Sequence, residues 1–214
     1  MPLLTSRTTR PGGVAAVAES GGTATAIPAD LSDLASTTAA VERVSSEIGA
    51  PRVLVNAAAT DAPGPAEDLA VEDWERVVRV NLTAPFLLAK LAFPYMRQAG
   101  GGTIVNVASV AGRRGWPNAT AYCATKFGLT GLTQALAAEG APHGIRVMSM
   151  YPGSMATHWG SFEPSDRMRR EPRPAEESLP AREVADYIAW LVTAPDHLVV
   201  TEAVVAPIRE RGWP

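Results

Sequence analysis

The fold is decided by residues 105–139, which read VNVASVAGRRGWPNATAYCATKFGLTGLTQALAAE. The first of these residues belong to GTIVNVAS at 102–109, whose length and β-branched, apolar composition are typical of a buried strand. Residues 119–139 have the composition of a long helix. A buried strand that leads through a loop into a helix is the unit from which parallel sheets are built.

The same alternation of short apolar runs and helical stretches continues on both sides of this segment. Further strands are predicted at ATAIPADL (24–31), RVLVNAA (52–58), IRVMSMYP (145–152) and LVVTEAVVAP (198–207). Further helices are predicted at 32–48, at 71–99 with a break or bend near two prolines, and at 181–193. We therefore expect an α/β fold, with one doubly wound parallel sheet between two layers of helices, in a single domain over residues 1–214.

Composition excludes several classes of function. The 214 residues are 46% hydrophobic and 19% charged, and the formal net charge of −3 leaves no excess of basic residues for binding nucleic acid. Cys123 has no second cysteine to pair with, which favours a cytoplasmic protein. No uninterrupted apolar run approaches the length of a membrane span, so no membrane association is expected. No metal site is predicted, and Cys123 and His143 are interpreted as structural.

The strongest candidates for chemistry are Tyr122 and Lys126. They stand four residues apart on a predicted helix, so their side chains share one face. An ammonium beside a phenol favours the phenolate, and we expect it to lower the pKa of Tyr122 toward the range of a general acid/base. The spacing alone is equally that of an ordinary surface contact between helix neighbours.

Two further polar residues strengthen this interpretation. Ser109 follows the predicted strand 102–109, and ligands of parallel sheets bind at the carboxyl ends of the strands. Its hydroxyl could bind a substrate oxygen. Asn81 lies within a predicted helix, where asparagine is unfavourable, so its amide could hold a carbonyl group or a water molecule. The alternative is that Asn81 only bonds to backbone atoms.

Together these segments resemble the short-chain dehydrogenases/reductases. The run 105–139 resembles the family's active-site segment, with a serine and a Tyr-x-x-x-Lys motif at the family's spacing. VNLTAPF (80–86), PADLSD (28–33) and YPGSMATHW (151–159) resemble three other segments of the family, in the same order along the chain. The resemblance implies a Rossmann-like sheet and a hydride transfer between a nicotinamide cofactor and a carbonyl or alcohol substrate.

The resemblance also implies roles for single residues. Tyr122 would be the acid or base, Ser109 would orient the substrate oxygen, Lys126 would bind the nicotinamide ribose, and Asn81 would be the fourth catalytic residue. The implied cofactor-binding residues, besides Tyr122 and Lys126, are Asp30, Leu31, Asn56, Ala57, Ala58, Pro152, Gly153 and Thr157. The implied lining of the substrate pocket is Trp116, His158, Trp159 and Phe162, which suggests an apolar or aromatic carbonyl compound. Arg7, at the end of a presumed strand, suits a ribose 2′-phosphate, so NADP is expected, with NAD as the alternative.

One part of the family's pattern is not found. The family begins with a strand, a glycine-rich turn and a helix that receives the pyrophosphate, whereas PLLTSR (2–7) resembles the end of the family's second strand. We therefore expect the first strand and the first helix to be missing, a gap within the sheet, and weak cofactor binding. The start could lie too late in a longer reading frame, which we favour. The protein could also be a truncated, noncatalytic member that acts as an oligomerisation partner, or PLLTSR could pair with the strand beyond the gap.

The resemblance further implies a homodimer or homotetramer that assembles through the helices near 71–99 and 119–139. Apolar side chains on these helices would divide between the core and the subunit interface. The candidates are Phe86, Leu87, Ala92, Phe127, Leu132 and Leu136.

Overall fold

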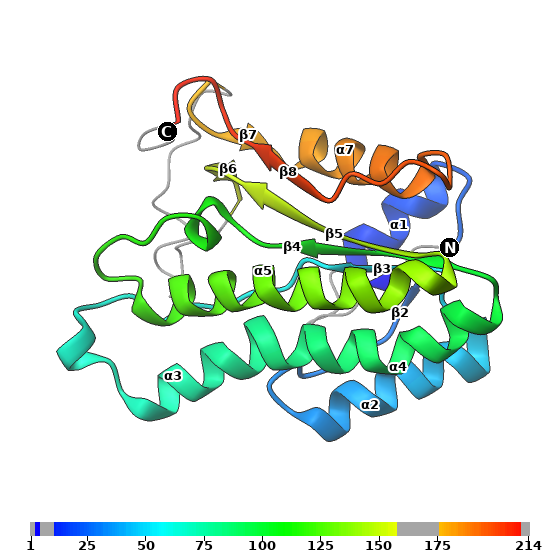
Figure 1. The fold of residues 1–214 in the computed structure, drawn as a ribbon, viewed down its shortest axis with the longest axis horizontal. Helices are drawn as coiled ribbons and strands as arrows, with labels where there is room; N and C mark the ends of the chain where they lie inside the picture. Colours follow the sequence, from blue (N-terminus) through cyan, green and yellow to red (C-terminus); the bar gives the residue numbers. More distant parts are fainter. Residues whose placement is uncertain (1–2, 5–10, 158–175, 211–214) are drawn as a thin grey trace.

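The structure is a computed structural model that describes residues 3–4, 11–157 and 176–210. Strands form a central layer with helices on both sides, as Figure 1 shows. The predicted α/β architecture with a parallel sheet is confirmed, because every strand pairing in the described residues is parallel.

The strands are β1 (Leu3–Leu4), β2 (Thr25–Ala26), β3 (Val53–Asn56), β4 (Gly102–Val107), β5 (Ile145–Pro152), β6 (Met155–Ala156), β7 (Leu179–Pro180) and β8 (Glu202–Val205). The main sheet has the order β3-β4-β5-β8, while β1-β2 and β6-β7 form two separate pairs. β5 lies in the interior of the main sheet, and each of its eight residues is buried. This burial explains its nearly continuous apolar sequence.

The helices are α1 (Pro11–Glu19), α2 (Leu34–Arg43), α3 (Val71–Val78), α4 (Ala84–Gln98), α5 (Thr120–Gly140) and α7 (Ala181–Thr193). A π-helical turn, η3 (Arg79–Thr83), joins α3 to α4. This turn is the irregularity predicted near Pro85, a residue that cannot donate a backbone hydrogen bond. At Pro94, the second predicted position, α4 continues without a break. The 310 turn η4 (Val110–Gly112) follows β4.

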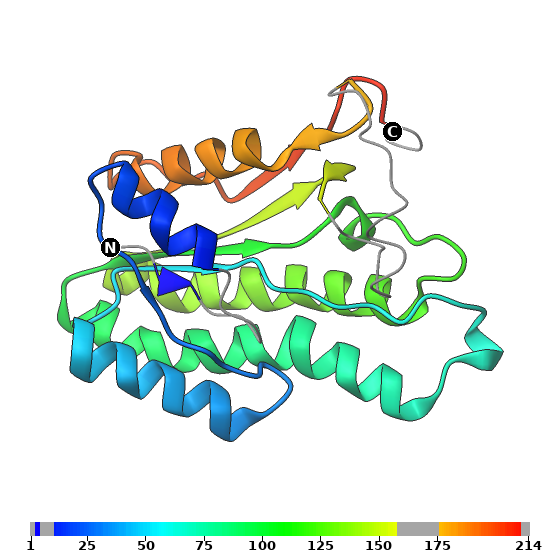
Figure 2. The same cartoon turned by 180° about the vertical axis from the view of Figure 1, so that it is seen from behind.

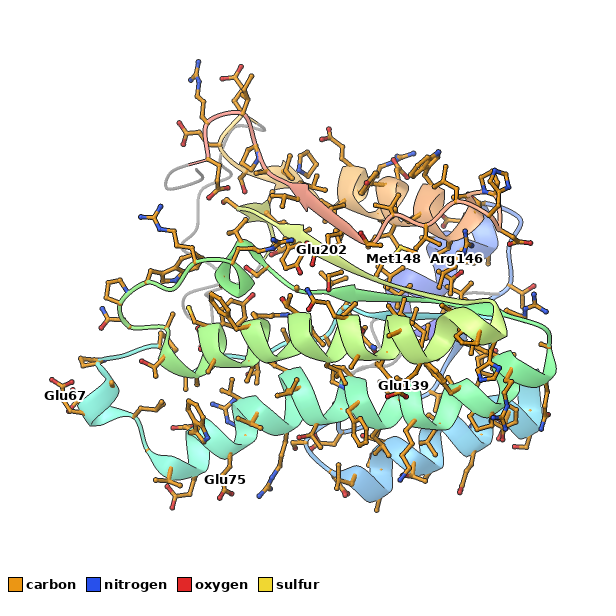
Figure 3. All side chains as sticks on the ribbon, in the orientation of Figure 1. Glu67, Glu75, Glu139, Arg146, Met148 and Glu202 are labelled. Atoms are coloured by element: carbon orange, nitrogen blue, oxygen red, sulfur yellow. The ribbon has the colours of Figure 1, made fainter. Side chains whose placement is uncertain are left out.

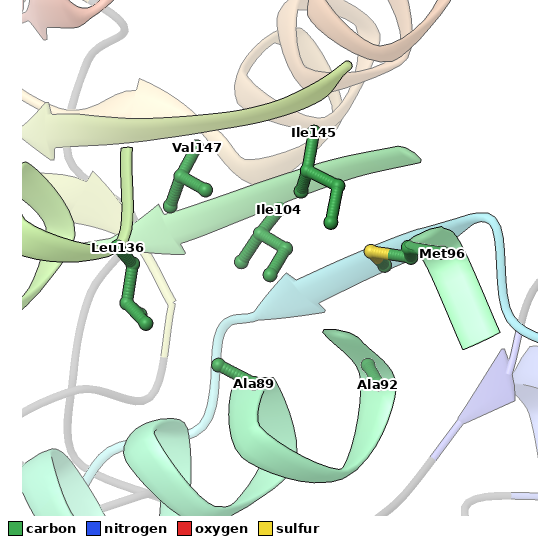
Figure 4. Close-up of a cluster of buried hydrophobic side chains, with 7 residues drawn as sticks. All are labelled: Ala89, Ala92, Met96, Ile104, Leu136, Ile145 and Val147. Atoms are coloured by element: carbon green, nitrogen blue, oxygen red, sulfur yellow. The ribbon is translucent and has the colours of Figure 1, made fainter. Parts of the chain in front are cut away.

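The core is divided between the two faces of the main sheet. On one face, Ile104 and Val147 pack against Ala89 and Met96 of α4 and Leu136 of α5, within the cluster drawn in Figure 4. Adjacent residues on the same strands point the other way, because side chains alternate along a strand. There, Val105 and Met148 pack against Leu191 of α7. Figure 2 shows the result from behind, with α7 on the opposite side of the sheet from α4.

The pairing of β1 tests one explanation for the expected gap in the sheet, namely that PLLTSR pairs with the strand beyond it. Within the described residues β1 pairs with β2 in register from Leu3 and Thr25, and β3 pairs with β4. The hypothesis that PLLTSR pairs across the expected gap is therefore wrong for its described part, Leu3–Leu4. Val53 and Val55 of β3 are 44% and 38% exposed, which is high for valines of a parallel sheet.

The continuous helix Val71–Gln98 is long and apolar enough, by length and composition alone, to cross a membrane. Its first turns carry Glu72, Asp73, Glu75, Arg76 and Arg79. Its second half supplies buried side chains to the core beneath the sheet, the cluster of Figure 4. This is the packing of a core helix.

Candidate active site

The carboxyl end of β4 carries the first candidate residue. Ser109 is the cap of η4, and its Oγ accepts a hydrogen bond of 3.1 Å from the backbone N–H of Ala111. The backbone N–H of Gly112 donates to the Ser109 carbonyl at 2.8 Å. The serine is therefore held by a tight turn that packs against α5, since a Cβ atom on Gly112 would lie 2.8 Å from the Lys126 carbonyl oxygen. Ser109 is 9% exposed.

Tyr122 lies in the first turn of α5, packed with Ala111, Ala119 and Cys123. Burial raises the pKa of its phenol to about 12, although a hydrogen bond with Ser109 acts in the opposite direction. The expected lowering of the Tyr122 pKa by Lys126 is therefore wrong for the protein without ligand. The charged phenolate loses water on burial, and this cost exceeds the effect of its neighbours.

Lys126 lies one turn further along α5, on the same face as predicted. Its Nζ donates a hydrogen bond of 2.8 Å to the carbonyl of Val107, the last residue of β4, and lies 5.5 Å from the centre of the Tyr122 ring. The side chain is almost fully buried, and burial lowers the pKa of its ammonium from 10.5 to about 7. An ammonium has three donors, so binding Val107 leaves it the capacity to bind ligand hydroxyls.

Asn81 lies in the π-helical turn η3 and is 1% exposed. Its amide exchanges two hydrogen bonds with the backbone of Thr60, at 2.8 and 2.9 Å, and donates to Thr125 Oγ1 at 3.2 Å. Thr125 Oγ1 in turn donates to the Tyr122 carbonyl at 2.8 Å. Asn81 therefore bonds to backbone atoms, which was the alternative to a catalytic role. It also joins the loop after β3 to the helix that carries Tyr122.

Comparison with known proteins shows to which family the chain belongs. Residues 3–167 match the short chain dehydrogenase family. The chain belongs to the short-chain dehydrogenase family. It is 34% identical over 203 residues to an uncharacterized oxidoreductase of Bacillus subtilis, covering 88% of this chain and 79% of the relative. It is 40% identical over 131 residues to D-threitol dehydrogenase of Mycolicibacterium smegmatis, covering 61% of this chain and only 50% of the relative.

A solved structure supports the same assignment. The crystal structure of a metagenomic short-chain oxidoreductase in complex with NADP aligns with a TM-score of 0.81 at 30% identity, covering 96% of this chain and 84% of that chain. The fold and the family are thus shown by sequence and by structure.

The remaining predicted residues of this short-chain dehydrogenase are only partly brought together. Pro152 ends β5 and Gly153 follows it, beside the end of β4, while Ala57 and Ala58 follow β3 and are exposed. Asp30 follows β2, where its carboxylate accepts hydrogen bonds from the N–H and hydroxyl of Ser32 at 2.9 and 2.7 Å. Leu31 is half-buried in the turn after Asp30, and the backbone N–H of Thr157 donates to the carbonyl of Met155 at 2.8 Å. Trp116 is 44% exposed, in the loop between η4 and α5. Arg7, His158, Trp159 and Phe162 lie outside the described residues.

The residues present fit the nicotinamide end of the cofactor. Lys126 offers donors at the end of β4. Gly153 leaves no room for a side chain, because a Cβ atom there would lie 2.5 Å from a carboxylate oxygen of Glu210 and 3.0 Å from Ala206, the residue after β8. Asn56 is buried and its Nδ2 donates to Asn106 at 2.7 Å, which fixes the end of β3 next to that of β4. Within the described parts of the chain, no glycine-rich turn stands between these strands and a helix N-terminus.

Two further polar residues lie near the site and were not predicted from the sequence. Asn106 is 1% exposed, accepts from Asn56 and donates to Thr133 of α5 at 2.9 Å. Its position inside the apolar run IVNV was a usable signal, because a buried amide must be paired. Asp61, in the loop held by Asn81, raises the pKa of Tyr122 by its charge.

The buried ammonium of Lys126 makes the stability of the protein depend on pH. Its folded pKa of about 7 lies below its ordinary value of 10.5, so the unfolded chain binds the extra proton between these values. The free energy of unfolding should rise with pH above about 7 by up to about 1.4 kcal/mol per unit. In Lys126→Met this part of the slope should disappear. Denaturant unfolding between pH 7 and 9.5 measures it, with Lys90→Met, an exposed lysine on α4, as the control. Equal slopes in wild type and Lys126→Met would refute the assignment.

Proposed function

We propose that this protein is an NAD(P)-dependent oxidoreductase that transfers hydride between a nicotinamide cofactor and a carbonyl or alcohol carbon. The observation that carries the proposal is the hydrogen-bonded pair Ser109 and Tyr122, with Lys126 one helical turn away at the carboxyl end of β4. NADP is the favoured cofactor and NAD the alternative, supported by the NADP complex of the structural relative. Nicotinamide, when bound, supplies the hydride.

The chain's own residues supply position and proton transfer. The Ser109 hydroxyl and the Tyr122 phenol are within hydrogen-bond reach of each other, so one substrate oxygen could accept hydrogen bonds from both. The raised pKa keeps the phenol protonated at neutral pH, so Tyr122 acts as the acid in carbonyl reduction. The ammonium of Lys126 would hold the ribose, and hydrogen bonds to the ribose hydroxyls would favour its charged form beside the phenol. Asn81 fixes the loop after β3 against α5.

The proposed substrates are small carbonyl compounds or alcohols, and the enzyme is expected in the cytoplasm. Trp116, exposed in the loop between Ser109 and Tyr122, is the support for an apolar substrate among the described residues. The relationship to D-threitol dehydrogenase adds a polyol as a second class. A panel of ketones and alcohols with NADPH, NADH and their oxidised forms, followed by cofactor absorbance, tests the proposal. Turnover with none of them would contradict it.

The glycine behind Ser109 gives a specific test of the geometry. In Gly112→Ala the new methyl group would meet the Lys126 carbonyl, 2.8 Å from its oxygen and 3.1 Å from its carbon. The turn must then move away from α5, which separates Ser109 from Tyr122. We expect turnover to fall by about 10²-fold, the cost of a small misplacement. Gly115→Ala is the matched control, because its Cβ would meet nothing within 4 Å and should leave turnover unchanged.

We also propose that the protein forms a homodimer through α4 and α5. Phe86 and Phe127 are each 47% exposed on these helices, whereas Ala92 and Leu136 of the predicted set are buried in the core. A surface cavity of about 500 Å³ lies between the two helices, lined by Phe86, Phe93, Leu136 and charged residues. Exposed aromatic side chains beside a hollow are typical of subunit interfaces.

Substitution of the exposed aromatic residues should separate the subunits. A carboxylate cannot be buried without a partner, so Phe86→Asp with Phe127→Asp should give a folded monomer. Light scattering measures the mass, and circular dichroism checks the fold. Leu34→Asp, at an exposed leucine of α2, is the control and should stay dimeric. A wild-type monomer at micromolar concentration would contradict the interface.

A further inference from the structure

Glu202 is the first residue of β8 and belongs to none of the site segments described above. Figure 3 shows it between β8 and β5. Its carboxylate forms an ion pair with Arg113, accepts a hydrogen bond from Gln134 Nε2 at 3.3 Å, and accepts one from the Tyr151 hydroxyl at 3.4 Å. The three donors come from the turn after β4, from α5 and from β5. One carboxylate therefore joins three elements that build the active site.

The contact with Arg113 acts directly on the turn that holds Ser109. Arg113 is the residue after η4, and its backbone N–H donates to Val110 at 3.0 Å. The turn between Ser109 and Arg113 is too short and too fully hydrogen-bonded for one end to move without the other. The contacts of the Arg113 guanidinium therefore act on a residue of the same short turn as Ser109.

The contact with Tyr151 acts on the helix that carries Tyr122 and Lys126. Tyr151 is fully buried, and its hydroxyl lies 3.2 Å from Thr130 Oγ1 as well as 3.4 Å from Glu202, so its single proton is shared between these two acceptors. Thr130 Oγ1 donates to the carbonyl of Lys126 at 3.1 Å. The guanidinium of Arg113 also lies over the Tyr151 ring, 4.3 Å from its centre. The turn and the helix are thus held to the same tyrosine.

These contacts differ from an isolated surface ion pair, which usually contributes little. The side chains of Arg113 and Glu202 are 35% and 31% exposed, and the pair belongs to a network with a fully buried hydroxyl. Strand register also places Glu202 level with Ser149 of β5, and Ser149 level with Asn106, near the carboxyl end of β4.

We propose that Glu202 is a positioning residue of the active site, which holds the Ser109 turn against α5 through Arg113 and Tyr151. The expected effect of Glu202 on turnover rests on the proposed function. The expected effect of Glu202 on the Ser109 turn does not depend on any activity. Glu202 touches neither Ser109 nor Tyr122 in the described contacts, so it acts only through its partners.

Hydrogen exchange tests the structural part of the inference without substrate or cofactor. In Glu202→Ala and in Arg113→Ala, the amides of Ala111, Gly112 and Arg113 should exchange about tenfold faster, because their turn opens more often. Exchange in β3 should stay unchanged. Glu47→Gln removes the exposed ion pair with Arg43 on α2 and serves as the matched control. Unchanged exchange at the turn in Glu202→Ala would overturn the proposal.

Kinetics test the functional part. Glu202→Ala should lower kcat about tenfold while KM changes less than about threefold, because the substrate oxygen is bound but badly oriented. Arg113→Ala should give a similar loss, and the double variant should lose less than the product of the two single losses, since both single variants remove the ion pair between these residues. Glu202→Gln keeps acceptors for Gln134 and Tyr151 and should recover part of the loss. A lowered melting temperature with unchanged kcat would show a merely structural pair and contradict the proposal. If the wild type shows no turnover, the proposed function fails, and hydrogen exchange alone decides the role of Glu202.

Discussion

Tyr122→Phe should reduce turnover by about 10³-fold, within the range that general acid catalysis contributes. The substitution removes a single oxygen atom from a side chain that is already packed with Ala111, Ala119 and Cys123, so the fold should be preserved. Without the phenol no group at this position can protonate the substrate oxygen, although Ser109 can still bind it. Cofactor affinity should change little, because Lys126 remains.

Steady-state kinetics with saturating cofactor measure this effect. Tyr187→Phe is the matched control, since Tyr187 lies on α7 on the other face of the sheet and should keep wild-type turnover. Turnover of Tyr122→Phe within about tenfold of wild type would remove Tyr122 from the mechanism, because a proton donor contributes at least 10²-fold.

Lys126→Met should weaken cofactor binding and also lower the rate. The ammonium is buried at the end of β4. There its N–H groups can donate hydrogen bonds to the ribose hydroxyls. Loss of one hydrogen bond to a charged group costs about 1.5 to 3 kcal/mol, which corresponds to about 10- to 100-fold in affinity. The rate should fall by a further factor of about ten, because the phenol loses its neighbouring charge.

Calorimetric titration with NADPH and measurement of kcat separate the two effects of Lys126→Met. Lys90→Met removes the other lysine of the chain, on the exposed side of α4, and should affect neither quantity. An effect on affinity alone, or on rate alone, would contradict the dual role of Lys126.

The sequence was sufficient to predict what depends on local periodicity. Strand 102–109 and helix 119–139 follow from composition and length, and the spacing of Tyr122 and Lys126 places them on one face. The position of Ser109 after a parallel strand then brings all three together. These features need only the geometry of one strand, one turn and one helix.

The sign of the Tyr122 pKa shift could not be predicted in this way. It depends on how deeply α5 is buried, and burial is set by tertiary packing against η4 and the loop after β3. For Asn81, the partners on Thr60 and Thr125 lie 21 and 44 residues away, so no local pattern reveals them.

Glu202 is the clearest example of a residue that sequence reasoning misses. It lies 89 residues from Arg113 and 51 from Tyr151, and its segment gave no motif. Only the strand order β4-β5-β8 brings these side chains together. Conversely, Asn106 was recognisable, since an amide within a buried apolar strand requires a partner.

The central claim is that this chain transfers hydride with Tyr122 as the proton donor. The most direct measurement is transfer of deuterium from NADPH deuterated at the reactive nicotinamide carbon to a ketone, such as erythrulose or cyclohexanone, detected by mass spectrometry of the alcohol. The cofactor should be supplied at millimolar concentration, since the described residues include no glycine-rich turn for its pyrophosphate. We expect deuterium on the alcohol carbon with the wild type and almost none with Tyr122→Phe. No transfer by the wild type from NADPH or NADH to any ketone of the panel, or equal transfer by both proteins, would contradict the account.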